Sequence, residues 1–85
     1  MNYTIHPHAQ NSMTLRHVTS DALESVIQNP EQAFRQEDGL LVHQSRISGP
    51  KKKPHLLRAF IDMNEIPPLV VTVISTSKVR KYWRI

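Results

Sequence analysis

Residues 56–76 read LLRAFIDMNEIPPLVVTVIST, and they hold the clearest β pattern in the chain. The first part, residues 56–63, alternates between two faces, as expected of a strand. One face carries Leu57, Ala59, Ile61 and Met63, and the other carries Leu56, Arg58, Phe60 and Asp62. After a turn with two prolines, residues 69–76 are apolar on both faces, which predicts a central strand that is covered on at least one side.

Two helices are predicted before this segment. The first spans residues 8–16 and follows Pro7, which is tolerated in the first turn of a helix. The second spans residues 20–29, with Thr19 as its N-cap and an end at the Asn29-Pro30 step, because a residue before proline disfavours the α conformation. Its apolar residues share one face: Leu23, Val26 and Ile27. His17 lies between the helices, where a positive φ is sometimes needed and glycine is the natural residue.

The remaining β-prone segments complete the fold class. Residues 3–5 predict a short edge strand, and residues 33–36 and 40–48 predict a hairpin around the Asp38-Gly39 turn. Residues 49–54 form a loop that is bounded by two prolines. This order predicts one α+β domain over residues 1–85, with two N-terminal helices packed on one face of a three- to four-stranded, mainly antiparallel meander sheet. The other sheet face should stay partly open, and Arg58 and Phe60 share a face of their strand.

The composition limits the classes of function. The chain has no cysteine, which excludes disulfides and thiolate zinc sites, and its five histidines lack a metal-ligand spacing, so we expect no metal or cofactor. With only two glycines, a glycine-rich phosphate loop and a glycine-flanked catalytic serine are both absent. No apolar run approaches the roughly 20 residues that span a bilayer. We therefore expect a cytoplasmic protein without membrane contact.

Positive charge is concentrated in the second half. The formal net charge is +4, and eight lysines and arginines follow Gly49 against only Asp62 and Glu65. Three lysines, Lys51, Lys52 and Lys53, lie in the predicted loop, and the end of the chain interleaves cations with aromatic rings as KVRKYWR.

Cations neutralise phosphates, and aromatic rings stack on unpaired bases with about 1–3 kcal/mol each. Histidine, lysine, arginine and tyrosine can also cleave RNA without a metal, by moving protons and stabilising the phosphorane. The same residues have simpler interpretations: a solvated lysine loop, and packing of Tyr82 or Trp83 onto the sheet.

Two segments resemble a known family. HAQNSMTLRHVTSDALESVIQNPE is similar to a His-Ala-x-x-Arg-Met…Asn-Pro-Glu opening, and LLRAFIDMNEIPPLVVTVISTSKVRKYW is similar to a Leu-Leu-Arg-Val…Val-Thr-Val-Tyr-x-Thr-Ser-Lys…Lys-Tyr closing motif. Both motifs belong to a small bacterial family grouped with the RelE/ParE-like toxins, close to BrnT. The resemblance implies an α+β toxin of a type II toxin–antitoxin module, a metal-independent mRNA endoribonuclease that acts on the ribosome or on free mRNA. Its partner would be a cognate antitoxin protein, in a hetero-oligomer.

The resemblance also implies the site. The matched positions give a catalytic set, which should converge on one basic face: His8, Arg16, Arg58, Lys78 and Tyr82. The other cations would bind RNA: Lys51, Lys52, Lys53, Arg80, Lys81 and Arg84. The chain departs from the motif at Ser12, where the family has arginine, and at Ile74, where it has tyrosine. RelE-like relatives cut RNA and ParE-like relatives poison gyrase, so the target stays open. A non-catalytic basic module that binds protein or RNA is the alternative.

Overall fold

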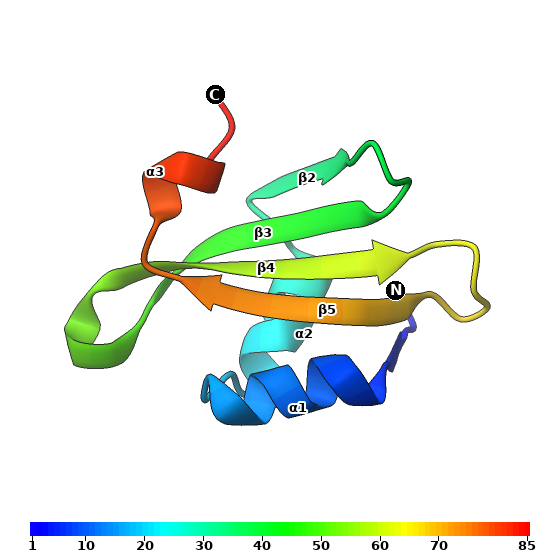
Figure 1. Cartoon of the computed structure of the whole chain (residues 1–85), viewed down its shortest axis with the longest axis horizontal. Coiled ribbons are helices and arrows are strands. Elements are labelled where there is room, and N and C mark those ends of the chain that lie inside the picture. Colours follow the sequence, from blue (N-terminus) through cyan, green and yellow to red (C-terminus); the bar gives the residue numbers. More distant parts are fainter.

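Five strands form one mixed sheet in the order β1-β5-β4-β3-β2 (Figure 1). The computed structural model describes residues 1–85. The strands are β1 (Thr4–Ile5), β2 (Gln32–Arg35), β3 (Leu41–Ser48), β4 (Pro54–Asp62) and β5 (Leu69–Thr76). Strands β2 to β5 are antiparallel neighbours, and β1 runs parallel to β5. The predicted meander is confirmed, but the sheet has five strands rather than three or four, because β1 adds to the outer edge of β5.

Two helices cover one face of this sheet, as the sequence predicts. They are α1 (Pro7–Leu15) and α2 (Ser20–Gln28), each within a residue or so of its predicted bounds. Thr19 caps α2 by accepting a hydrogen bond from the Ala22 backbone N–H at 3.1 Å. Between the helices, His17 has a φ of 56°, so the positive φ expected there is confirmed. None of the helices in the chain is long and apolar enough to cross a bilayer.

The core lies between the helices and the sheet, and β4 is its middle strand. A cluster of ten buried residues fills this layer: Ala9, Met13, Leu23, Val26, Ile27, Leu57, Ala59, Ile61, Val70 and Val73. On β4 the alternation holds, because Leu57, Ala59 and Ile61 point into this cluster. Their neighbours Leu56, Arg58 and Phe60 are also buried, so β4 is covered on both faces.

Residues 69–76 form a strand inside the sheet, as predicted, because β5 lies between β1 and β4. The middle strand is β4, and β1 pairs with β5 only at Leu69 and Val70. A register shift beside Phe60 explains its apolar character on both faces, since Val70 and Val73 both reach the helical core.

A third helix, α3 (Val79–Tyr82), follows β5 and has no fully buried residue. The backbone carbonyl of Tyr82 accepts a hydrogen bond from Gln44, which pairs with Arg58 in the sheet register. The side chains of Gln44 and Arg58 are on the sheet face that points away from α1 and α2. The end of α3 therefore lies on that face. The sequence offers packing of Tyr82 or Trp83 onto the sheet as one interpretation, but it does not predict this helix.

Replacing Leu57 tests the position of the core. Leu57 has no exposed surface, so Leu57→Ala should lower the free energy of unfolding by about 2–5 kcal/mol. Leu15 is 72% exposed at the end of α1, and Leu15→Ala should change it by less than about 0.5 kcal/mol. Urea denaturation measures both. Equal losses for the two variants would contradict this placement of the core.

Candidate nucleic-acid interface

The sheet face opposite α1 and α2, together with the segment 78–85 that lies on it, is called the C-terminal face here. The strand register determines which side chains lie on the C-terminal face, because residues paired across strands share a face of the sheet. Gln32 pairs with Gln44, and Gln44 pairs with Arg58, so these three side chains form a row across β2, β3 and β4. Phe34, Val42 and Phe60 form the next row. Polar and aromatic side chains thus alternate along this face.

Arg58 lies at the centre of the C-terminal face without a carboxylate partner. Its side chain is largely buried, with 8% of the residue exposed, and its Nε donates a hydrogen bond to Gln44 Oε1 at 2.9 Å. The guanidinium carbon lies 4.4 Å from the centre of the Tyr82 ring and 5.1 Å from that of Phe60. The only ion pair in the protein joins two other residues, so the charge of Arg58 has no acidic counterpart within 4.0 Å.

This environment lowers the pKa of Arg58. Burial is the main cause, the charge of Arg84 adds to it, and Tyr82 acts in the opposite direction. A buried cation is unfavourable unless it is paired or hydrogen-bonded. The terminal nitrogens of Arg58 make no hydrogen bond within the protein, and no fully buried polar atom lacks a partner. These nitrogens are therefore available to an oxyanion such as phosphate, which guanidinium groups bind in a bidentate manner.

Two glutamines hold the end of the chain against the C-terminal face. Gln44 Nε2 donates to Gln32 Oε1 at 2.7 Å and to the Tyr82 carbonyl at 3.0 Å. Gln32 Oε1 also accepts from the Arg84 backbone N–H at 3.1 Å, and Gln32 Nε2 donates to the Arg84 carbonyl. Because Gln44 also bonds to Arg58, one polar network joins the guanidinium to the backbone of residues 82–84. Polar contacts and ring stacking, more than apolar burial, fix this segment.

A second arginine–aromatic stack, Arg46 on Trp83, differs from the stack of Arg58 on Tyr82 because its arginine has an acidic partner. The Arg46 guanidinium lies 4.4 Å from the centre of a Trp83 ring and pairs with Glu31 through Nη2 and Nε, at 2.9 and 3.2 Å. Hydrogen bonds from the Arg46 side chain and backbone lower the pKa of Glu31 to about 2. Glu31 therefore neutralises Arg46, which leaves the free positive charge of this face on Arg58 and on residues of the α3 segment.

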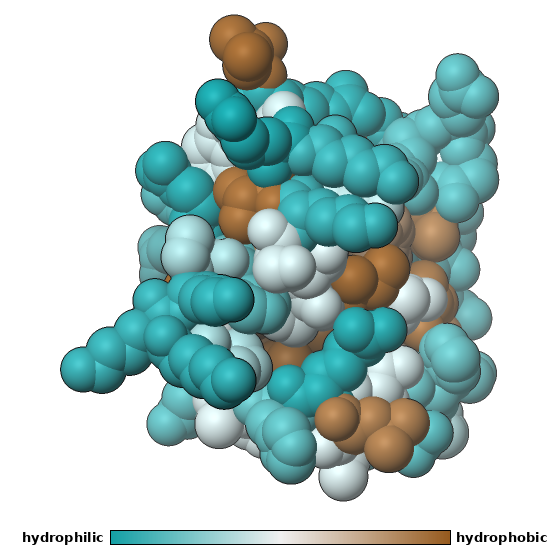
Figure 2. All heavy atoms as spheres, turned by 60° about the vertical axis from the view of Figure 1, so that its left-hand side comes forward, coloured by the Kyte–Doolittle hydropathy of each residue, from teal (hydrophilic) through white to brown (hydrophobic).

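Two further cations lie near Arg58 and the aromatic rings that it contacts, Phe60 and Tyr82. Lys81 Nζ lies 5.3 Å from the centre of the Tyr82 ring, and the Arg84 guanidinium carbon lies 3.7 Å from that of Phe34. Neither cation forms an ion pair. Figure 2 shows the end of the molecule that carries α3 and the β3–β4 loop, and hydrophilic side chains cover most of it between small hydrophobic patches. Several unpaired cations thus lie beside aromatic rings, a combination that is typical of proteins that bind single-stranded nucleic acids.

The structure does not bring His8 to this face. His8 is exposed on α1, and its neighbour Ala9 packs in the core with Leu57 and Ala59. These two strand residues flank Arg58 in the sequence and point to the opposite side of β4. His8 and Arg58 therefore lie on opposite sides of the sheet. The expected convergence of all five candidate catalytic residues on one face is wrong, because α1 lies in the other layer.

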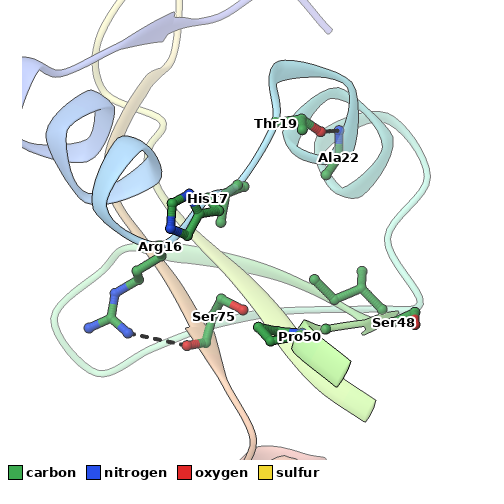
Figure 3. A pocket seen from close by; sticks show the side chains of 10 residues that line it. Arg16, His17, Thr19, Ala22, Ser48, Pro50 and Ser75 are labelled. Carbon is green, nitrogen blue, oxygen red and sulfur yellow. Dashed lines mark hydrogen bonds between the residues drawn. The ribbon is translucent and has the colours of Figure 1, made fainter. Parts of the chain in front are cut away.

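Arg16 is also in the helical layer. Its Nη1 donates to the Ser75 carbonyl at 3.2 Å, and Ser75 pairs with Leu57, whose side chain points to the helices. Figure 3 shows Arg16 and His17 at a pocket of about 370 Å³, between the α1–α2 connection and the β3–β4 loop. Arg16 thus belongs to a separate hollow and does not contact the Arg58 stack.

The other predicted cations are exposed. Lys78 is the N-cap residue of α3, and Arg80 is the second residue of that helix. The three loop lysines, Lys51, Lys52 and Lys53, are exposed around the turn η1 (Pro50–Lys52), at the same end of the sheet as α3 (Figure 1). Of the two departures from the family motif, Ser12 lies on α1, whereas Ile74 pairs with Arg58 and therefore belongs to the C-terminal face.

Sequence reasoning did not identify Gln32, Gln44, Arg46 or Phe34 as parts of the site. The alternation of residues 40–48 could have placed Gln44 and Arg46 on one face, but nothing local indicates which strand lies beside them. No group of three metal-ligating side chains occurs in the chain. No protein-family model, curated protein or solved structure matches this chain.

The ion pair below Trp83 predicts a pH dependence of stability. The pKa of Glu31 is lowered from 4.5 to about 2, so its contribution to stability is complete above pH 4.5 and is lost as the pH falls towards 2. Wild type should exceed Glu31→Gln in free energy of unfolding at pH 6, and the two should converge near pH 2. Added salt should reduce the difference, because the two side chains are 57% and 38% exposed. Urea denaturation across this pH range measures it, and a difference independent of pH would contradict the assignment.

Proposed function

We propose that this protein binds RNA through the C-terminal face, and that it is a RelE/ParE-like toxin that cleaves mRNA there without a metal ion. The observation that carries the proposal is the buried Arg58, which contacts two aromatic rings and has no carboxylate partner. A protein that only needed stability at this position would gain from an apolar side chain or an acidic partner. A guanidinium with free terminal donors is suited to bind phosphate.

The neighbours of Arg58 favour RNA over a small anion. Lys81 and Arg84 add unpaired charge on the same face, so several successive phosphates can be bound. Tyr82 and Trp83 place two aromatic rings within this positive surface. Rings stack on bases only where the bases are unpaired. The combination supports a single-stranded substrate such as mRNA in the cytoplasm.

Cleavage at this face would use the RNA itself as the nucleophile. The 2′-oxygen attacks the adjacent phosphorus, the bond from phosphorus to the 5′-oxygen breaks, and the products carry a 2′,3′-cyclic phosphate and a 5′-hydroxyl. Arg58 would stabilise the negative phosphorane. The 2′-hydroxyl proton must be removed and the leaving oxygen must gain one, and Tyr82 and Lys81 are the groups beside Arg58 that can carry protons.

The partner implied by this proposal is an antitoxin that masks the C-terminal face. An acidic segment would fit, because Glu31 is the one carboxylate paired with a cation here, and Arg58, Lys81 and Arg84 are left unpaired. A second candidate function is RNA or protein binding without cleavage. It is favoured by His8 being across the sheet from Arg58 and by Ile74 beside Arg58, where the family motif has tyrosine.

Removing one hydroxyl group tests the catalytic part of the proposal. Tyr82→Phe keeps the ring that stacks on Arg58 and removes the proton donor, so cleavage of purified mRNA should fall by about 100-fold or more, with RNA affinity retained. His8→Ala is the control, and its activity should match wild type because His8 lies in the other layer. Mapping of transcript ends and bacterial growth after expression without an antitoxin measure both variants.

The outcomes of this experiment are distinct. Binding without cleavage by wild type would favour the non-catalytic function. Loss of cleavage in His8→Ala, with Tyr82→Phe fully active, would contradict the assignment of the site to the C-terminal face. Absence of RNA binding by wild type would overturn the proposal as a whole.

Salt dependence tests the phosphate contacts separately. If Lys81 neutralises one phosphate, Lys81→Ala should reduce the slope of log affinity against log salt by about 0.7 for a single strand. Arg35→Ala is the matched control, because Arg35 follows Phe34 on β2 and points away from the C-terminal face. Filter binding between 50 and 200 mM salt, a range over which such contacts lose affinity strongly, measures both slopes. Equal reductions for the two variants would indicate that the charge of the whole chain, and not this face, binds RNA.

A further inference from the structure

A hollow of about 380 Å³ lies beside α3. It is lined by Arg46, Val79, Arg80, Trp83 and Ile85. Three of these side chains are apolar, and the other two are arginines. Its volume is within the range of small-molecule sites, about 300–1,000 Å³. The hollow is therefore large enough for one flat ring system. Its apolar walls form a slot that lies beside two positively charged side chains.

The Trp83 ring in this hollow is held in place from one side. Arg46 stacks on it at 4.4 Å, and Glu31 fixes the Arg46 guanidinium through two hydrogen bonds. The backbone on either side of Trp83 is also fixed, because Gln44 bonds to Tyr82 and Gln32 bonds to Arg84. An indole that is already immobilised loses little conformational freedom when a second ring stacks on it.

The charges around the hollow are unequal. Glu31 neutralises Arg46, whereas Arg80 has no ion pair and is exposed at the rim. The ring of Tyr82, the residue before Trp83, contacts the unpaired Arg58. One unpaired cation, Arg80, thus lines the hollow together with the Trp83 ring. This pattern complements a chain that has a negative group beside each flat ring, as a nucleic-acid strand does.

We propose that this hollow binds one unpaired base of the RNA strand, which stacks on Trp83 while an adjacent phosphate lies at Arg80. This inference rests on the proposed function and names its substrate more closely, as single-stranded RNA. A base in a duplex is already stacked and paired, so it cannot enter the slot. The aromatic side chain of a protein partner could fill the same slot, but it carries no anion next to the ring as a part of its own backbone.

Matched probes without a 2′-hydroxyl test the base subsite, because they cannot be cleaved. The first is a ten-nucleotide deoxyadenosine strand, the second is an abasic deoxyribose-phosphate strand of the same length, and the third is the first strand annealed to its complement. Trp83 is the one tryptophan of the chain, so its fluorescence reports directly on the hollow. Anisotropy of labelled probes measures affinity independently.

The full chain should bind the adenosine strand at least about fivefold more tightly than the abasic strand or the duplex, with quenching of Trp83 by the adenosine strand alone. Trp83→Leu should remove this preference without changing affinity for the abasic strand. Trp83→Phe, which keeps a ring, should retain part of the preference and provides the second variant if Trp83→Leu does not fold. Arg80→Ala should weaken both single strands equally.

Two results would overturn the inference in different ways. Equal affinity of wild type for the adenosine and abasic strands would exclude a base subsite at Trp83, and the phosphate contacts of the proposed function would stand. If neither these strands nor RNA of the same length bound to wild type, the proposed function would fail together with the subsite.

Discussion

The solvation of one buried guanidinium organises the C-terminal half of this structure. Arg58 is on the middle strand of the sheet, where both faces are covered and little water reaches it. Its charge is stabilised by Gln44 and by the faces of two aromatic rings, Phe60 and Tyr82. Tyr82 reaches Arg58 because the chain turns back over the sheet after β5 and forms α3. The last residues of the chain therefore cover this cation without neutralising it.

The two arginine–aromatic stacks, Arg46 on Trp83 and Arg58 on Tyr82, have similar distances but differ in whether the arginine is paired. Arg46 pairs with Glu31 in an exposed position, where an ion pair contributes little to stability but sets the orientation of both side chains. Arg58 has no such partner, so its charge stays available while its burial weakens competition from water. One arginine thus stacks on Trp83 with its charge neutralised, and the other stacks on Tyr82 with its charge unpaired. This division supports a surface that binds rings and phosphates side by side.

Local signals account for most of the fold that the sequence predicts. The Thr19 cap, the Asn29-Pro30 step and the Asp38-Gly39 turn each act over a few residues, so the elements beside them lie close to their predicted bounds. The helix α3 is different, because its last residue is held by Gln44, 38 positions away in the chain. Residues 3–5 predict a short strand, but only its pairing with the distant β5 makes it a fifth strand of the sheet.

Some features of the candidate site also follow from the sequence, and others depend on contacts between distant segments. By itself, the sequence determined that Arg58 and Phe60 share one face of their strand and that Leu57 and Ala59 share the other, because side chains alternate with a period of two. It also determined that the end of the chain is basic and aromatic. Only the tertiary structure decided that Gln44 lies beside Arg58, that Tyr82 covers it, and that His8 lies across the sheet. These relations depend on strand register and on which layer each helix joins, and both are set by contacts between distant segments.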